Sequence, residues 1–151
     1  MSINWYPGHM HKARKEILAA LNNIDILIEV VDARLPYSSQ NPIIANLRHN
    51  KPTIIVLNKC DLADPDVTQQ WQDYYQSHDN VKTVTCQQNM PEKTRKILDT
   101  CKDIASEKDA SFKAINAMIL GIPNVGKSTI INTLAGRIIA KTGNEPAVTK
   151  R

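Results

Sequence analysis

The sequence has few cysteines and no long apolar run. Its three cysteines, Cys60, Cys86 and Cys101, are odd in number and follow no metal-ligand spacing, which argues against a disulfide framework or a zinc site. No apolar run approaches the roughly 20 residues that a membrane-spanning helix needs. No apolar segment follows the first residues as it does in a secretory signal. These absences favour a cytoplasmic protein with free thiols.

Internal repeats and linkers are also lacking. The 151 residues are 42% hydrophobic and 23% charged, ordinary globular proportions that argue against a disordered or collagen-like chain. No stretch rich in Pro, Gly and Ser divides the chain, so we expect a single domain. Nineteen Lys and Arg against 15 Asp and Glu leave a charge of +4, which permits contact with nucleic acid without requiring it.

Apolar, β-branched runs alternate with segments of helical length. The runs 24–31, 53–57, 81–85 and 115–120 predict buried strands. Segments 9–21, 41–49, 67–77 and 91–106 predict helices, and a further helix should begin at Lys127. This alternation is typical of an α/β fold with a parallel sheet covered by helices on both faces. Because such sheets bind ligands beyond the carboxyl ends of their strands, we expect the site in the loops there.

The segment after the run 115–120 matches the phosphate-binding loop pattern. Gly121-Ile-Pro-Asn-Val-Gly126-Lys127-Ser128 follows a predicted strand and precedes an apolar-periodic helix. In such a loop backbone N–H groups surround phosphate oxygens, the lysine neutralises the β and γ phosphates, and the serine hydroxyl is a ligand for Mg²⁺. A glycine-rich turn without a ligand is the alternative. The strand and helix around the loop favour nucleotide binding.

A second motif, Asn58-Lys59-Cys60-Asp61, follows the run 53–57 and should therefore share the same sheet edge. A carboxylate at the position of Asp61 can accept hydrogen bonds from N1 and N2 of guanine, a pair of donors that adenine lacks. Asn58 and Lys59 can hold the ring and the loop. Alone, the motif could be a polar loop after a strand. Together with the phosphate loop it predicts a protein that binds GTP and GDP.

The order of the two motifs is unusual, because the guanine motif precedes the phosphate loop by about sixty residues. The chain also contains Trp5-Tyr-Pro-Gly-His-Met10, Val31-Asp-Ala-Arg-Leu-Pro36 and Ala140-Lys-Thr-Gly143. With these motifs it resembles, over nearly its whole length, the circularly permuted GTPases of ribosome assembly, that is, the ribosome biogenesis GTPase A group and its mitochondrial relatives. The resemblance implies a three-layer parallel sheet of the P-loop NTPase type, and we expect the strand 115–120 to lie beside the strand 24–31.

The resemblance also implies roles for individual residues. It places Cys86 in a loop that contacts guanine through backbone N–H groups, and it associates Asn124 with K⁺ as an activating ion. The nucleotide site would further include residues of the phosphate loop and the helix that follows it: Val125, Gly126, Lys127, Ser128 and Thr129.

Two more residues take their roles from the resemblance. Thr149 lies where the family has its switch threonine, which senses Mg²⁺ and the γ phosphate, although this chain has Pro146-Ala-Val-Thr149 where the family usually has Pro-Gly-Ile-Thr. His9 is a catalytic candidate that could orient the attacking water. The alternative for His9 is a local role, satisfying backbone groups at the start of a helix.

The implied function is slow hydrolysis of GTP, switched on by the large ribosomal subunit precursor and its rRNA. The family continues beyond the position of Arg151 with an Asp-x-x-Gly loop and a helical domain that contacts RNA. We therefore expect residues 1–151 to form an incomplete GTP-binding domain that lacks its last strands. The strand 115–120 would then be an open edge unless another segment covers it. The alternatives are a non-hydrolysing module that binds guanine nucleotide and RNA, and an inactive fragment of such a GTPase.

Overall fold

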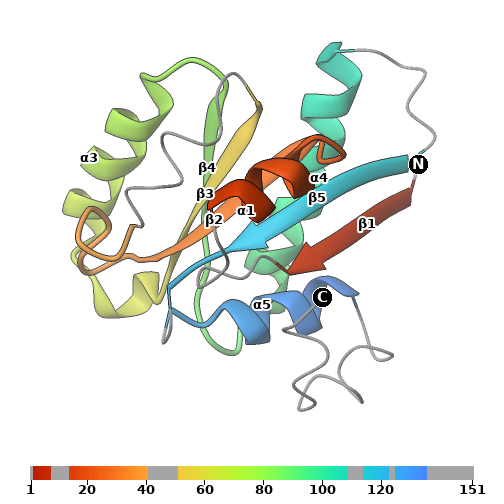
Figure 1. Ribbon diagram of the computed structural model, residues 1–151. Helices are drawn as coiled ribbons and strands as arrows, with labels where there is room; N and C mark the ends of the chain where they lie inside the picture. The colour runs from red at the N-terminus through yellow and green to blue at the C-terminus, as the bar shows by residue number, and fades with distance from the viewer. Residues whose placement is uncertain (1, 8–13, 41–50, 109–113, 123–124, 136–151) are drawn as a thin grey trace.

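The computed structural model describes residues 2–7, 14–40, 51–108, 114–122 and 125–135. Its centre is a parallel sheet with the strand order β1-β5-β2-β3-β4 (Figure 1). The strands are β1 (Ser2–Pro7), β2 (Ile26–Asp32), β3 (Thr53–Asn58), β4 (Val81–Thr85) and β5 (Ala114–Leu120). The helices are α1 (Arg14–Leu21), α3 (Pro65–Gln76), α4 (Pro91–Lys108) and α5 (Lys127–Ala135), with a short 3-10 turn, η1 (Cys60–Leu62), after β3.

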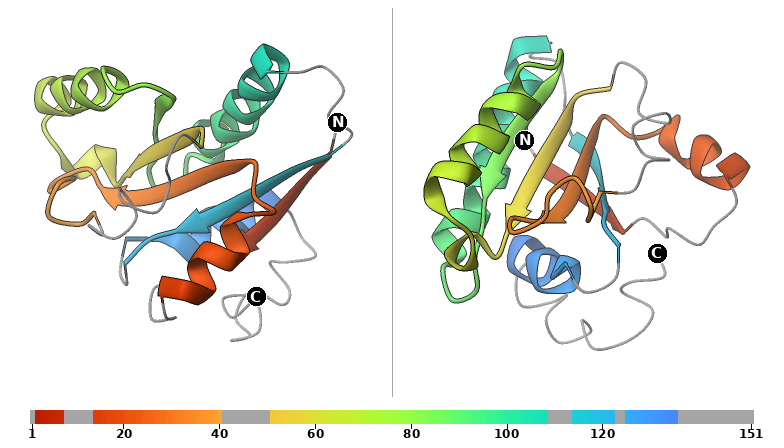
Figure 2. Two further views of the ribbon diagram at one scale, coloured as in Figure 1. Left: turned by 45° about the horizontal axis from the view of Figure 1, so that its top comes forward. Right: turned by 90° about the vertical axis from the view of Figure 1, so that its left-hand side faces the viewer.

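Helices cover both faces of the sheet because the strand residues alternate between two apolar faces. Ile54 and Val56 of β3 pack in the same cluster as residues of α4 and α5, whereas Leu57 packs in a cluster with Tyr75 of α3. Helix α1 packs on the face that α3 covers, through a separate cluster that contains Leu21. In the left view of Figure 2, α1 lies in front of β5 and α5 behind it. The predicted three-layer parallel α/β fold is confirmed.

The predicted elements agree with the observed ones to within two residues wherever the structure describes them. The strand 24–31 becomes Ile26–Asp32, the helix 67–77 becomes Pro65–Gln76, and α5 begins at Lys127 as predicted. Helix α3 starts early because Asp64 caps it, accepting hydrogen bonds from the N–H groups of Asp66 and Val67. The predicted helix 41–49 and the first part of the helix 9–21 lie outside the described residues.

One strand was missed, and it changes the expectation of an open edge. β5 lies beside β2, as predicted, but its other side pairs with β1 in parallel, from Ser2 opposite Ala114 to Pro7 opposite Ile119. The side-chain amide of Asn4 donates to that of Asn116 across this pair at 3.0 Å. The first strand therefore covers the edge of β5. It was missed because only Ile3 in it is β-branched, although the alternation of Ile3 and Trp5 with Asn4 and Tyr6 is the pattern of a half-buried strand.

Mutations on the two faces of β1 should lower stability by different amounts. Trp5 packs against the large core cluster, whereas Tyr6 points the other way and is 41% exposed. We expect Trp5→Ala to lower the free energy of unfolding by about 2 kcal/mol, because it removes a partly buried aromatic ring. Tyr6→Ala, the matched control on the same strand, should change it by less than about 0.5 kcal/mol. Urea unfolding followed by circular dichroism measures both, and equal midpoints for Trp5→Ala and the wild type would contradict the pairing.

Candidate functional site

The two sequence motifs meet at the carboxyl edge of the sheet. The side-chain amide of Asn58, at the end of β3, donates a hydrogen bond of 2.8 Å to the backbone carbonyl of Val125, 67 residues further along. Gly126 has a φ of +91°, and a Cβ atom at this position would collide with the same Asn58 amide. The close approach of the loop to Asn58 thus requires glycine at 126. The permuted order of the motifs does not prevent them from forming one site.

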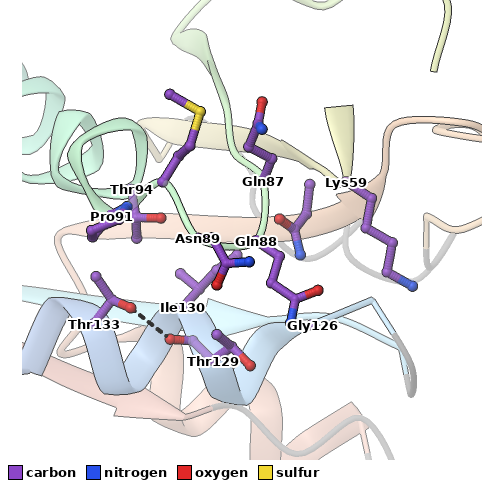
Figure 3. A pocket seen from close by; sticks show the side chains of 12 residues that line it. Lys59, Gln87, Gln88, Asn89, Pro91, Thr94, Gly126, Thr129, Ile130 and Thr133 are labelled. Atoms are coloured by element: carbon purple, nitrogen blue, oxygen red, sulfur yellow. Dashed lines mark hydrogen bonds between the residues drawn. The ribbon is translucent and has the colours of Figure 1, made fainter. Parts of the chain in front are cut away.

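A cavity of about 520 Å³ lies between these motifs, a volume within the usual range of small-molecule sites. Figure 3 shows Lys59 and Gln87 on one side of it and Thr129 and Thr133 of α5 on the other. Its lining comes from β3, from the phosphate loop with α5, and from the β4–α4 connection: Asn58, Lys59, Gln87, Gln88, Asn89, Met90, Pro91, Thr94, Gly126, Thr129, Ile130 and Thr133.

The phosphate loop leads directly into the N-terminal turn of α5. Backbone N–H groups of a first helical turn have no partner within the helix and carry partial positive charge, so they attract anions. Burial lowers the pKa of Lys127, because desolvation disfavours the charged ammonium. A bound phosphate would favour that charge again. The side chain of Ser128 is exposed in the same turn, and its hydroxyl can act as a metal ligand beside phosphate oxygens.

Charged side chains gather beside the guanine motif. Lys59 has a left-handed backbone with φ of 62°, and its ammonium lies 3.7 Å from the carboxylate of Asp32 at the end of β2. The guanidinium of Arg34 contacts the same carboxylate at 2.7 Å, and this hydrogen bond is the main reason that the pKa of Asp32 is lowered. Hydrogen bonding to Asp32 raises the pKa of Arg34, and the negative charge of Asp61 raises it further. Asp61, exposed on η1, therefore lies within the electrostatic reach of Arg34.

The loop after β4 is tied to the guanine motif through its backbone. The N–H of Cys86 donates to the carbonyl of Leu57, and the N–H of Cys60 donates to the carbonyl of Cys86, at 2.9 and 3.0 Å. The Cys86 side chain is fully buried, and burial raises the pKa of its thiol to about 11. Because its N–H is already bonded within the protein, Cys86 acts as an anchor for the loop. The next residue, Gln87, is the first of this loop to line the cavity.

The structure brings most of the predicted site residues to one edge. Asn58, Lys59, Gly126 and Thr129 line the cavity, Cys86 and Val125 are buried beneath it, and Asp61, Lys127 and Ser128 lie in the adjoining turns. His9, Asn124 and Thr149 lie outside the described residues.

Sequence reasoning assigned no role to the side chains of Asp32, Gln87 and Lys93, although Asp32 belongs to the motif 31–36 and Gln87 to the predicted guanine-contacting loop. Asp32 could have been found by its position at the carboxyl end of a predicted strand. Lys93 gave no such signal, because a lysine in the first turns of a helix is ordinary.

The parallel sheet and the phosphate loop after β5 define a P-loop GTPase fold with permuted motif order. The family model of 50S ribosome-binding GTPases matches residues 116–151. The chain is 47% identical to ribosome biogenesis GTPase A of Priestia megaterium over 99% of its own length and 54% of that protein. It is 34% identical to mitochondrial ribosome-associated GTPase 1 of Mus musculus, over 97% of its own length and 48% of that protein.

Solved structures give the same result. The crystal structure of GNP-bound YlqF from T. maritima matches with a TM-score of 0.61 at 33% identity, covering 84% of this chain and 49% of that one. The GDP-bound YlqF structure matches with a TM-score of 0.58 at 30% identity. The resemblance to ribosome biogenesis GTPase A and its mitochondrial relatives is confirmed, and the chain spans about half the length of the curated relatives it matches.

Within the five described segments, no helix is both long enough and apolar enough to cross a membrane.

Substitution of Gly126 tests the junction between the motifs. We expect Gly126→Ala to lower the free energy of unfolding by about 2 kcal/mol, because the methyl group strains a positive φ and displaces the buried Asn58 amide from its partner. Ser128→Ala changes an exposed side chain two residues away and should change the free energy of unfolding, measured by urea unfolding, by less than about 0.5 kcal/mol. An unchanged midpoint for Gly126→Ala would show that the junction tolerates a Cβ atom.

The charges around Asp32 predict a dependence on pH. A carboxylate whose pKa is lowered by folding stabilises the folded state above its unfolded pKa of about 3.9, and this contribution is lost as the pH falls through the folded value. We expect Asp32→Asn to cost about 1 kcal/mol at pH 7, with the difference from the wild type fading below about pH 4.

Asp99→Asn, on the exposed surface of α4, is the control and should cost little at any pH. Urea unfolding between pH 3 and 7 measures both variants. A difference between Asp32→Asn and the wild type that does not change with pH would contradict the charged network.

Proposed function

We propose that this chain is the guanine-nucleotide-binding domain, in permuted order, of a GTPase that assists assembly of the large ribosomal subunit. The hydrogen bond between the Asn58 amide and the Val125 carbonyl carries the proposal, because it joins a base-recognition motif and a phosphate loop that are 67 residues apart. The proposed domain comprises residues 1–151. GTP and GDP are its ligands.

Base selection is assigned to the loops after β3 and β4. The carboxylate of Asp61 would accept from N1 and N2 of guanine, which excludes adenine. Asn58 and Cys86 hold the two loops in place through the bonds described above. Lys59 lines the cavity from a left-handed backbone conformation, a strained geometry that is common where side chains contact ligands.

The phosphates are assigned to the loop before α5. Val125, Gly126, Lys127 and Thr129 would surround them, with the Lys127 ammonium beside the β and γ phosphates. The exposed Ser128 hydroxyl fits a Mg²⁺ ion that takes its other ligands from phosphate and water. Thr149 would add a second contact to this ion and to the γ phosphate.

Hydrolysis and its activation are assigned to residues outside the described ranges. His9 would orient the attacking water, and Asn124 would make the rate depend on K⁺. The large ribosomal subunit precursor and its rRNA are the proposed partners, and the cytoplasm the proposed location. The printed names of the relatives support the ribosomal role. The order of events would be that of a switch in which GTP favours the ribosome-binding state and GDP releases it.

Nucleotide binding is tested by titrating the chain with fluorescent GDP in Mg²⁺ and K⁺, then competing with GTP, ADP and ATP. We expect GTP and GDP to compete with the fluorescent GDP. ADP and ATP should bind at least about a hundredfold more weakly, because the adenine edge leaves the Asp61 carboxylate unpaired. Asp61→Asn should abolish the preference. A folded chain that binds no guanine nucleotide would refute the proposal.

The same samples extend the test to turnover. Phosphate release in the presence of large-subunit precursors should be faster in K⁺ than in Na⁺ and should fall in His9→Ala. Binding of GTP without any release of phosphate would favour a non-hydrolysing guanine-nucleotide module.

A further inference from the structure

Exposed apolar side chains gather around α3. Among the described residues six large apolar side chains are exposed, and five of them, between 45% and 69% exposed, lie in the loop after β2, in η1 and in α3: Leu35, Tyr37, Leu62, Val67 and Tyr74. These segments pack together, because Ala33 of the loop shares an apolar cluster with Ala63 and Trp71. The hydroxyl of Tyr75 also donates to the side-chain oxygen of Gln40 at 3.3 Å. A group of exposed apolar side chains of this kind is typical of a surface that binds a partner.

Aromatic side chains form one stripe along α3 and the turn after it. Val67, Trp71, Tyr74 and His78 follow one another at intervals of four, three and four residues, which places them on one flank of the helix. The Tyr74 ring meets the rings of Trp71 and His78 edge-on, with centroids 5.8 and 5.0 Å apart. Trp71 in turn stacks on the buried Tyr75 at 5.7 Å. Because the core holds these rings in place, a partner would bind them at a small cost in side-chain entropy.

The opposite flank of α3 is used within the protein. The amide of Gln72 donates to the Thr83 hydroxyl at 3.1 Å, and the side-chain oxygen of Gln76 accepts from the Thr83 N–H at 3.3 Å. These bonds cover the edge of β4, where an open strand would otherwise attract other chains. The aromatic stripe is therefore the flank of α3 that can bind another molecule.

The charge around the stripe selects the kind of partner. Residues 60–81 contain five aspartates and no lysine or arginine, in a chain whose net charge is +4. All five are exposed: Asp61, Asp64, Asp66, Asp73 and Asp79. In the loop after β2, the charge of Arg34 is offset by its ion pair with Asp32 at 2.7 Å. Such a surface repels RNA phosphates and attracts lysine and arginine side chains.

We propose that this α3 surface, formed by the apolar side chains of Leu35, Tyr37, Leu62, Val67, Trp71 and Tyr74 with the aspartates around them, binds a basic, partly apolar segment of a protein. Arginine or lysine side chains of the partner would stack on the exposed tyrosine rings and pair with the aspartates. For the source of the partner the inference rests on the proposed function. A ribosomal precursor consists of RNA and of proteins that bind it, and proteins that bind RNA carry clusters of Lys and Arg.

Reversal of charge distinguishes a protein partner from RNA by the sign of its effect. The full chain, with Mg²⁺ and a GTP analogue that is not hydrolysed, is titrated with purified large-subunit precursors. The double variant Asp73→Lys/Asp79→Lys should weaken binding roughly tenfold, because two attractions become repulsions. The control, Asp99→Lys/Asp103→Lys, changes the net charge equally on the exposed surface of α4 and should not weaken binding.

The aromatic part of the surface has its own test. Tyr74→Ala should weaken binding to the precursors roughly tenfold, whereas Tyr74→Phe, which keeps the ring, should weaken it by less than about twofold. Circular dichroism of each variant separates loss of binding from loss of folding. In a third variant, Tyr74→p-benzoylphenylalanine, the photoreactive side chain should become attached to a protein segment that contains Lys or Arg.

Tighter or unchanged binding of Asp73→Lys/Asp79→Lys would overturn the inference. Equal losses in Tyr74→Ala and Tyr74→Phe, attachment of the photoreactive side chain to rRNA, or no attachment would do the same. Failure of the proposed function is distinct, because the wild type itself would then bind neither GDP nor the precursors.

Discussion

The hydrogen bond from the Asn58 amide to the Val125 carbonyl is the constraint on which the rest of the site depends. Asn58 is only 9% exposed, so movement of the phosphate loop away from it would leave its buried amide unpaired, at a cost of roughly 1–3 kcal/mol. The same contact leaves no room for a side chain at Gly126. One buried polar pair thus fixes the distance between the part of the site that recognises the base and the part that holds phosphate.

A parallel sheet explains why motif order is not critical. The carboxyl ends of all parallel strands lie at one edge, so loops that follow β2, β3, β4 and β5 meet there regardless of which comes first in the chain. β5 is the last of the described strands in sequence, yet it lies between β1 and β2 in the sheet. Arg34, Asp61, Gln87 and Lys127 therefore surround a common region although they are spread over almost a hundred residues.

Much of this architecture was predictable from the sequence, because buried parallel strands are continuous apolar runs and the phosphate loop is a specific pattern. β1 was not predictable, because it is a short edge strand with one β-branched residue. Its sequence pattern is weaker than the helix and turn patterns around it. The contacts of Gln87 and Lys93 were also beyond sequence reasoning. They depend on how the start of α4 turns against η1, which is a matter of tertiary packing and leaves no periodic signal.

The pairing of β1 with β5 has a consequence for the order in which the protein folds. Strands β2, β3 and β4 are consecutive and adjacent, so they can assemble as soon as they leave the ribosome, whereas Asn4 must wait for Asn116, 112 residues later. At a synthesis rate of 5–20 residues per second this delay is on the order of ten seconds. Strand β1 is therefore translated well before its partner strand, and during that interval the Trp5 side chain is exposed to chaperones.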